Sequence, residues 1–111
     1  MFIALDVSLS LIKTLRPIIQ RLERRNPAMA KQLVNAASSV ALNLAEGSQR
    51  RGKDQPHLYR IAAGSASEAR TAVQVSRSLG WLDGLDLREI DELFDRQAAV
   101  LYRLLNPKRR G

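Results

Sequence analysis

The sequence predicts an all-α protein, an antiparallel up-down-up-down four-helix bundle. Four long stretches carry apolar residues at three- and four-residue steps, and no stretch alternates apolar and polar residues with a period of two. The breaks between the stretches are short, and short connections place consecutive helices of similar length antiparallel. From the length of 111 residues we expect one domain, 1–111, with a basic C-terminal tail at 107–111.

The first helix is predicted from about Leu5 to Arg25. Its apolar stripe consists of Leu9, Ile12, Leu15, Ile19 and Leu22. Pro17 lies inside this stretch and lacks a backbone donor, so the sequence allows either a kink there or a helix that begins near Arg16. Asn26 followed by Pro27 then predicts a helix cap and the first turn of the next helix.

Three further helices follow. The second is predicted to run to about Gly47, which we expect to be its C-terminal cap. The third is predicted from a cap at Asp54 to about Leu79, and the fourth from a cap at Asp86 to the stop at 106–107.

The charge is strongly positive and unevenly distributed. Lys and Arg number 18 against 11 Asp and Glu, which gives a net charge of +7, and residues 1–80 carry the whole excess. The basic residues gather in three clusters: Arg21, Arg24 and Arg25; Arg50, Arg51 and Lys53; and Lys108, Arg109 and Arg110. The bundle topology predicts the second and third clusters at one end, and the first cluster with Lys31 at the other, beside the acidic residues after Trp81. Such a surface attracts polyanions and would contact phosphates rather than base edges.

Composition removes most enzyme classes. The chain has no cysteine and a single histidine, His57, which excludes disulfides, Cys-ligated zinc and thiol nucleophiles. No Glu or Asp stands three residues before His57, and no Gly-rich turn joins a strand to a helix, so we expect no metal and no cofactor. No apolar run approaches membrane-spanning length, and the N-terminus lacks the features of a cleaved leader, so we expect a soluble protein without membrane contact. The lack of cysteine indicates a cytoplasmic protein, and the composition indicates a non-enzymatic one.

A family resemblance rests on the second and third helices. The pattern is a pair of small polar residues, Asn, Ala-Glu-Gly and a basic residue, then Gly-Ser and a Glu three residues later. It is occupied here by Ser38, Ser39, Asn43, Ala45, Glu46, Gly47, Arg50, Gly64, Ser65 and Glu68. This stretch resembles the bacterial four-helix-bundle proteins encoded in intervening sequences of large-subunit ribosomal RNA genes. Their relatives include the accessory variability determinant proteins of diversity-generating retroelements.

The resemblance implies a homopentamer with a basic surface that binds RNA or DNA without catalysis. In the retroelement branch, it also implies a reverse transcriptase as partner. Two alternatives remain open. Arg51 and His57 loosely resemble the Arg-x4–6-His signature of helical ribonucleases in the higher-eukaryote-and-prokaryote nucleotide-binding superfamily, where such a pair would serve acid/base work and phosphate stabilisation. The other alternative is a plain structural scaffold whose charge keeps it soluble.

The motif residues also have a structural interpretation. If the two central helices pack around a turn near Arg51, facing residues have numbers that sum to about 103, so Ser39 faces Gly64 and Ser38 faces Ser65. Their small side chains permit close helix approach, and a polar network that fixes the register is favoured over an active site. Glu46 lies near a helix C-terminus, where a carboxylate is unfavourable, so we expect a basic partner such as Arg50 or Arg60.

Overall fold

The structure, a computed structural model, describes residues 1–107. These residues form α-helices and connecting turns and no strand, as predicted. There are five helices rather than four: α1 (Ile3–Thr14), α2 (Arg16–Arg25), α3 (Pro27–Ser48), α4 (Asp54–Ser78) and α5 (Arg88–Leu105). The extra helix arises because the first predicted helix is divided in two.

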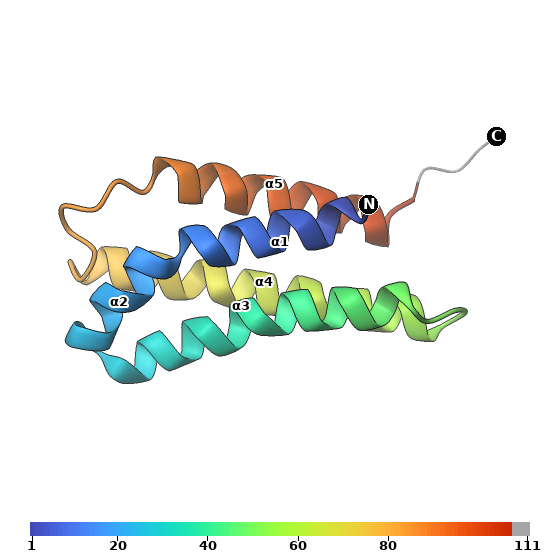
Figure 1. Ribbon diagram of the computed structural model, residues 1–111, viewed down its shortest axis with the longest axis horizontal. Helices are drawn as coiled ribbons and strands as arrows, with labels where there is room; N and C mark the ends of the chain where they lie inside the picture. Colours follow the sequence, from blue (N-terminus) through green and yellow to red (C-terminus); the bar gives the residue numbers. More distant parts are fainter. Residues whose placement is uncertain (108–111) are drawn as a thin grey trace.

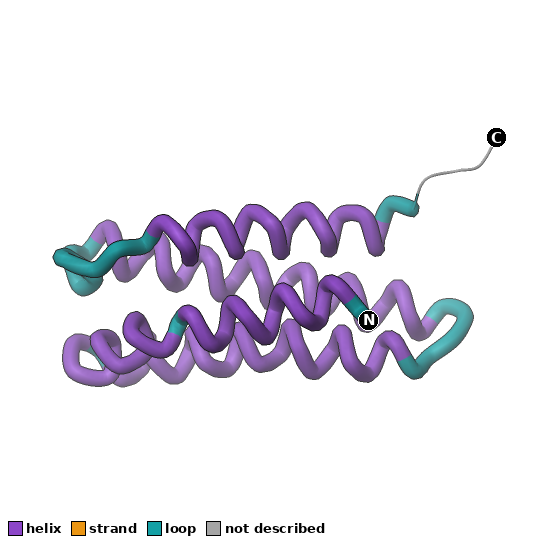
Figure 2. The backbone as a smooth tube through the Cα atoms, turned by 45° about the horizontal axis from the view of Figure 1, so that its top comes forward, coloured by secondary structure: helices purple, strands orange, loops and turns teal. Residues whose placement is uncertain are grey.

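The helices lie side by side along one long axis (Figure 1). α1 and α2 follow each other in one direction, α3 returns, α4 reverses again and α5 returns once more (Figures 1 and 2). The N-terminus, the α3–α4 turn and the end of α5 therefore lie at one end, and the α2–α3 and α4–α5 connections at the other. α1 packs against α3 and α5, and α4 packs against the same two helices, so the order around the bundle is α1, α3, α4, α5.

The break between α1 and α2 lies at Leu15, at the place that Pro17 predicts. Pro17 occupies the first turn of α2, where its missing N–H leaves no hydrogen bond unmade. Of the predicted apolar stripe, Leu15 and Leu22 are buried and Ile12 and Ile19 are half-buried, whereas the prediction was wrong for Leu9, which is 51% exposed. Ile18, which we did not include, is buried. The chain thus keeps one core-facing side although the helix is interrupted.

Two of the predicted N-terminal caps differ from the structure. Asn26 caps α3 as predicted, since its Oδ1 accepts a hydrogen bond from the Met29 N–H at 3.1 Å. The N-cap of α4 is Lys53, and Asp54 is instead the first helical residue, where its carboxylate still favours the positive end of the helix dipole.

Asp86 does not cap α5 directly. The N-cap of α5 is Leu87, and the Asp86 carboxylate accepts a hydrogen bond from the Arg88 N–H at 3.1 Å. Asp86, one residue before the N-cap, thus pairs with one of the backbone N–H groups in the first turn of α5 that have no partner within the helix. α5 ends at Leu105, immediately before the predicted stop.

The core consists of two clusters along the axis. The cluster toward the α2 end contains the large buried residues Leu11, Leu15, Ile18, Leu22, Leu33 and Phe94. The cluster toward the α3–α4 turn is built from smaller residues around one buried aromatic ring: Ala4, Val40, Leu44, Tyr59, Ala62, Ala66 and Leu101. The predicted close approach of α3 and α4 is confirmed, because alanines of both helices are buried between them.

Candidate nucleic-acid interface

The α3–α4 turn carries one of the predicted basic clusters, and Gly47 lets α4 pack closely beneath it. Gly47 is not the C-terminal cap that we predicted, because α3 continues to Ser48. It is buried, and a Cβ placed on it would lie 2.6 Å from Cε1 of Tyr59. Tyr59 in turn packs on Phe2, with ring centroids 5.9 Å apart, and its burial raises the pKa of the phenol. Glycine at this position is therefore required by packing.

Gln55 fastens the turn. Its Nε2 donates to the carbonyl oxygens of Gly47 and Arg50, each at 3.1 Å. The Gly47 carbonyl also accepts from the Arg50 N–H at 3.1 Å, so Gln55 adds to the bonds that hold the turn. Gly52 adopts φ +65°, a left-handed conformation that allows the reversal. We did not predict the role of Gln55, although an amide side chain just after a tight turn is suited to reach back to such carbonyls.

Glu46 and Arg50 form an ion pair one helical turn apart. Arg50 donates to Oε1 of Glu46 at 2.7 Å, which confirms Arg50 rather than Arg60 as the basic partner of Glu46. This hydrogen bond and the charge of Glu46 raise the pKa of Arg50. The pair holds Arg50 against α3.

Arg51 and Lys53 are exposed and take part in none of the ion pairs found within residues 1–107. Because Gln55 fixes the backbone around them, these two cations are presented from a defined loop. Lys108, Arg109 and Arg110, which we predicted beside them, lie outside the described residues. α5 nevertheless ends at the same end of the molecule (Figure 1).

At the opposite end, Arg21 has a different role from its neighbours. Its Nη1 donates to the carbonyl oxygens of Trp81 at 3.2 Å and Asp83 at 2.9 Å, so it fastens the α4–α5 connection to α2. Arg24 and Arg25, in the last turn of α2, are exposed. Only these two residues of the first cluster therefore have side chains fully available to a partner.

Arginines neutralise part of the acidic surface near α5. Three ion pairs lie there: Arg70–Asp95, Arg77–Asp91 and Arg88–Asp86. In the last of these, the hydrogen bond from Arg88 lowers the pKa of Asp86. Among residues 1–107, Lys13 and Arg16 at the α1–α2 break and Arg96 on α5 also take part in none of these ion pairs, so unpaired positive charge is present along the helices as well as at the two ends.

A polar network connects α3 to α4 within the motif, as predicted, with a register one residue away from the prediction. The hydroxyls of Ser39 and Ser65 lie 2.8 Å apart, so facing residue numbers sum to 104 rather than 103. Nδ2 of Asn43 donates to the carbonyl oxygen of Ser39 at 2.8 Å and to its hydroxyl at 3.1 Å. Glu68 is exposed and Ser38 is half-buried, and neither joins this network.

Gly64 contrasts with Gly47. It lies in the middle of α4, is exposed, and a Cβ built on it would meet no atom within 4 Å. Packing within the described chain therefore does not explain this glycine.

His57 is exposed on α4, in the turn that follows Lys53. Within residues 1–107, no group of three or more His, Cys, Asp or Glu side chains is arranged to hold a metal ion. In the same part of the chain, no helix combines the length and apolar character needed to cross a bilayer.

Comparisons with known proteins identify the family. No curated protein sequence matches the chain significantly. A solved structure that matches is the crystal structure of a protein with unknown function from the S23 ribosomal protein family of Bacteroides thetaiotaomicron. The two structures have a TM-score of 0.81 and 17% sequence identity, over 93% of this chain and 98% of that chain, which shows a shared fold. The family model of the 23S rRNA-intervening sequence proteins matches residues 4–103. The chain therefore belongs to the family of 23S rRNA-intervening sequence proteins.

Proposed function

We propose that this protein is a non-enzymatic nucleic-acid-binding protein that acts as a homo-oligomer. In this proposal, α1 and α2 together form one arm of an antiparallel four-helix bundle. Exposed basic side chains at the ends of the bundle contact phosphates of RNA or DNA with weak sequence preference. The resemblance to intervening-sequence and retroelement accessory proteins supports a pentamer. It also supports a reverse transcriptase, or another nucleic-acid-handling protein, as a further partner.

The observation that carries this proposal is the state of Arg51 and Lys53. They are exposed, lie in a turn that Gln55 fastens, and take no part in the ion pairs of residues 1–107. Because Gln55 holds the backbone beside these two residues, the entropy lost on binding a phosphate is mainly that of their side chains. Repetition of such a turn around an oligomer would multiply the number of phosphate contacts.

Composition favours binding over catalysis, because the chain has no cysteine and a single histidine. His57 is the single histidine of the chain and is exposed, and no hydrogen bond from its ring to another described residue holds it in place. A general base in an active site is normally positioned by a hydrogen-bonding partner. The ribonuclease alternative with Arg51 and His57 stays open, and the activity of His57→Ala distinguishes it from the proposal.

A charge-matched pair of variants tests the proposal. Arg51→Gln/Lys53→Gln removes two unpaired cations, whereas Arg77→Gln/Arg88→Gln removes the same charge from residues that are already paired with Asp91 and Asp86. Binding of a fluorescent single-stranded RNA is measured by anisotropy over a range of salt concentrations. Each lost phosphate contact lowers the slope of log affinity against log salt by about 0.7 for a single strand, so the first variant should lose about 1.4 per protomer.

The control variant should keep a slope close to that of the wild type. Equal loss in both variants would mean that only net charge matters and would contradict a defined contact at the turn. No binding of single-stranded or duplex oligonucleotide by the wild type at low salt would refute the proposed function.

A further inference from the structure

Positive charge is concentrated in the chain around α3. Residues 21–53, which run from α2 through α3 to the α3–α4 turn, contain seven basic residues and two acidic ones. Residues 83–105, which lead into α5 and form it, contain six acidic residues and three basic ones. α3 and α5 lie diagonally across the bundle, because α1 and α4 each pack against both of them. A polyanion is therefore attracted to the α3 side and repelled from α5.

Two groups of cations flank α3. Arg24 and Arg25 end α2, just before α3 begins, and Lys31 lies in the second turn of α3. All three are exposed and take part in none of the ion pairs found within residues 1–107, and we call them the α2-end cations. Arg51 and Lys53, which are equally exposed and unpaired in that part of the chain, follow α3 at its other end (Figure 1). We call these two the turn cations.

Between the two groups, the outer side of α3 presents no unpaired carboxylate. Residues that follow each other at steps of three, four or seven lie on one side of a helix. On the outer side of α3 these are Lys31, Asn35, Ser38, Leu42 and Gln49, of which Ser38 is half-buried and the others are exposed. Glu46, the single acidic residue of α3, is already paired with Arg50. A polyanion that lies along this side therefore meets no free negative charge from α3.

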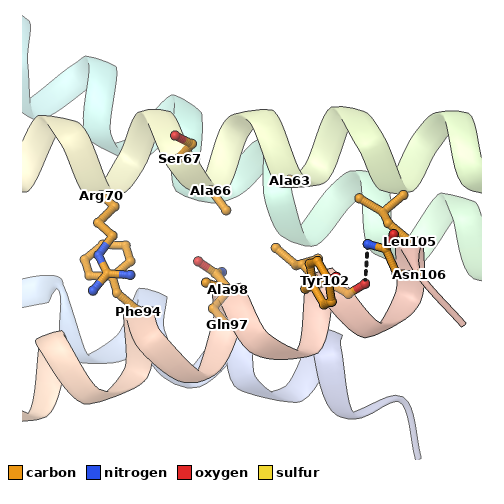
Figure 3. Close-up of a pocket in the computed structure, with 11 residues that line it drawn as sticks. Ala63, Ala66, Ser67, Arg70, Phe94, Gln97, Ala98, Tyr102, Leu105 and Asn106 are labelled. Atoms are coloured by element: carbon orange, nitrogen blue, oxygen red, sulfur yellow. Dashed lines mark hydrogen bonds between the residues drawn. The ribbon is translucent and has the colours of Figure 1, made fainter. Parts of the chain in front are cut away.

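Two arginines between α4 and α5 are engaged by their own chain instead. Arg70 pairs with Asp95, and its guanidinium lies over the ring of Phe94, 5.8 Å from the ring centroid (Figure 3). Arg77 pairs with Asp91. Because the charges of these two arginines are balanced by carboxylates, they add little to the attraction of a polyanion.

The separation of the two groups of cations is close to one turn of a double helix. α3 has 22 residues, which span about 33 Å. Phosphates of one strand return to the same side of a B-form duplex after about 34 Å, or about 10 base pairs. α3 is one uninterrupted helix and holds the two groups at a fixed distance. A fixed distance of this size suits the regular phosphate repeat of a duplex.

We propose that double-stranded nucleic acid lies along α3, with the α2-end cations on phosphates of one turn and the turn cations on phosphates of the next. This inference rests on the proposed nucleic-acid binding and names its substrate class, a duplex at least one turn long. When one end of α3 holds the duplex, the effective concentration of the duplex at the other end rises. The contacts are to phosphates, so the duplex is bound with little sequence preference.

The experiment varies the length of the duplex. A DNA duplex of about 16 base pairs is roughly 54 Å long and reaches both groups of cations, whereas a stem of about 6 base pairs is roughly 20 Å long and reaches only one. The short stem is closed by an uncharged linker so that it stays double-stranded. Binding of each fluorescent duplex is measured by anisotropy over a range of salt concentrations.

Three charge-matched variants are compared with the wild type. Arg24→Gln/Arg25→Gln removes two α2-end cations, and Arg51→Gln/Lys53→Gln removes the turn cations. Arg77→Gln/Arg88→Gln is the control, because both of its arginines are already paired. All six positions are exposed, and circular dichroism checks the fold. Lys31→Gln replaces the first variant if that variant fails to fold.

A duplex held at both ends of α3 predicts different losses on the two lengths. On the long duplex, each of the first two variants should bind at least about tenfold more weakly at low salt. Its slope of log affinity against log salt should fall by about 1.8, because two phosphate contacts are lost. On the short stem, each variant should lose no more than about twofold, because the intact end still binds. The control should match the wild type on both lengths.

Equal losses on the two lengths, or no loss in Arg24→Gln/Arg25→Gln, would overturn the inference although nucleic-acid binding stands. A single strand of about 16 nucleotides that binds as tightly as the long duplex, with the same loss in both variants, would also overturn it, because no helical repeat is then needed. The same series is measured with duplex RNA, and losses confined to the long form of either duplex support the inference. A wild type that binds none of these oligonucleotides would refute the proposed function itself.

Discussion

Alanine at the two helical glycines of the motif should change stability in opposite directions. Both positions lie inside helices, where alanine is more favourable than glycine by about 1 kcal/mol. At Gly64 the added methyl group meets no atom within 4 Å, so Gly64→Ala should stabilise the protein by about that amount. At Gly47 the same methyl group would lie 2.6 Å and 2.9 Å from ring carbons of Tyr59, a buried side chain that cannot easily move.

Overpacking of this kind costs about 1–3 kcal/mol, so Gly47→Ala should destabilise the protein by up to about 2 kcal/mol after the gain in helix propensity. Urea denaturation at one fixed protein concentration measures both effects. With a slope of about 1.5 kcal/mol/M, midpoints of the two variants should differ by about 0.7 to 2 M. In a Tyr59→Leu background, Gly47→Ala should lose most of its cost, because the ring is gone. Equal stabilisation by both alanines would refute the packing of Tyr59 on Gly47.

Three further predictions concern single side chains. The stability of Tyr59→Phe relative to the wild type should rise as pH rises above about 10, because burial raises the pKa of Tyr59 in the folded protein and its ionisation therefore favours the unfolded chain. Urea midpoints of both proteins between pH 8 and 11 measure this, and a midpoint difference that does not change with pH would contradict it. Arg21→Met should release the carbonyls of Trp81 and Asp83, speed amide exchange in the α4–α5 connection and cost about 1 kcal/mol; unchanged exchange there would argue against the fastening role. His57→Ala should bind RNA with an affinity within about twofold of the wild type, and any cleavage that the wild type shows in a gel assay should persist in the variant. Loss of a nuclease activity in the variant would instead favour the ribonuclease alternative.

The helices could be predicted from the sequence because their apolar spacing is long and regular. The break near Pro17 and the cap at Asn26 follow from local chemistry, and the structure agrees with both. The caps at Asp54 and Asp86 were each wrong by one residue, because an acidic residue near the start of a helix satisfies the first turn from more than one position.

Features that depend on contacts between helices could not be predicted from spacing. The register between α3 and α4 was wrong by one residue, since the hydrogen bond between Ser39 and Ser65 depends on the exact length of the turn. Gly47 resembles a helix cap in the sequence, and its function in packing becomes visible only when the ring of Tyr59 is placed against it. The fastening role of Arg21 likewise depends on a connection 60 residues away along the chain.

The measurement that tests the central claim most directly is binding of RNA and of duplex DNA to the wild-type protein as a function of salt, with the mass of the complex followed by light scattering. The account predicts an oligomer that takes up nucleic acid at low salt and releases it progressively as salt rises, with a linear fall of log affinity against log salt concentration. A monomer that binds no nucleic acid at low salt, or an affinity that salt leaves unchanged, would contradict it.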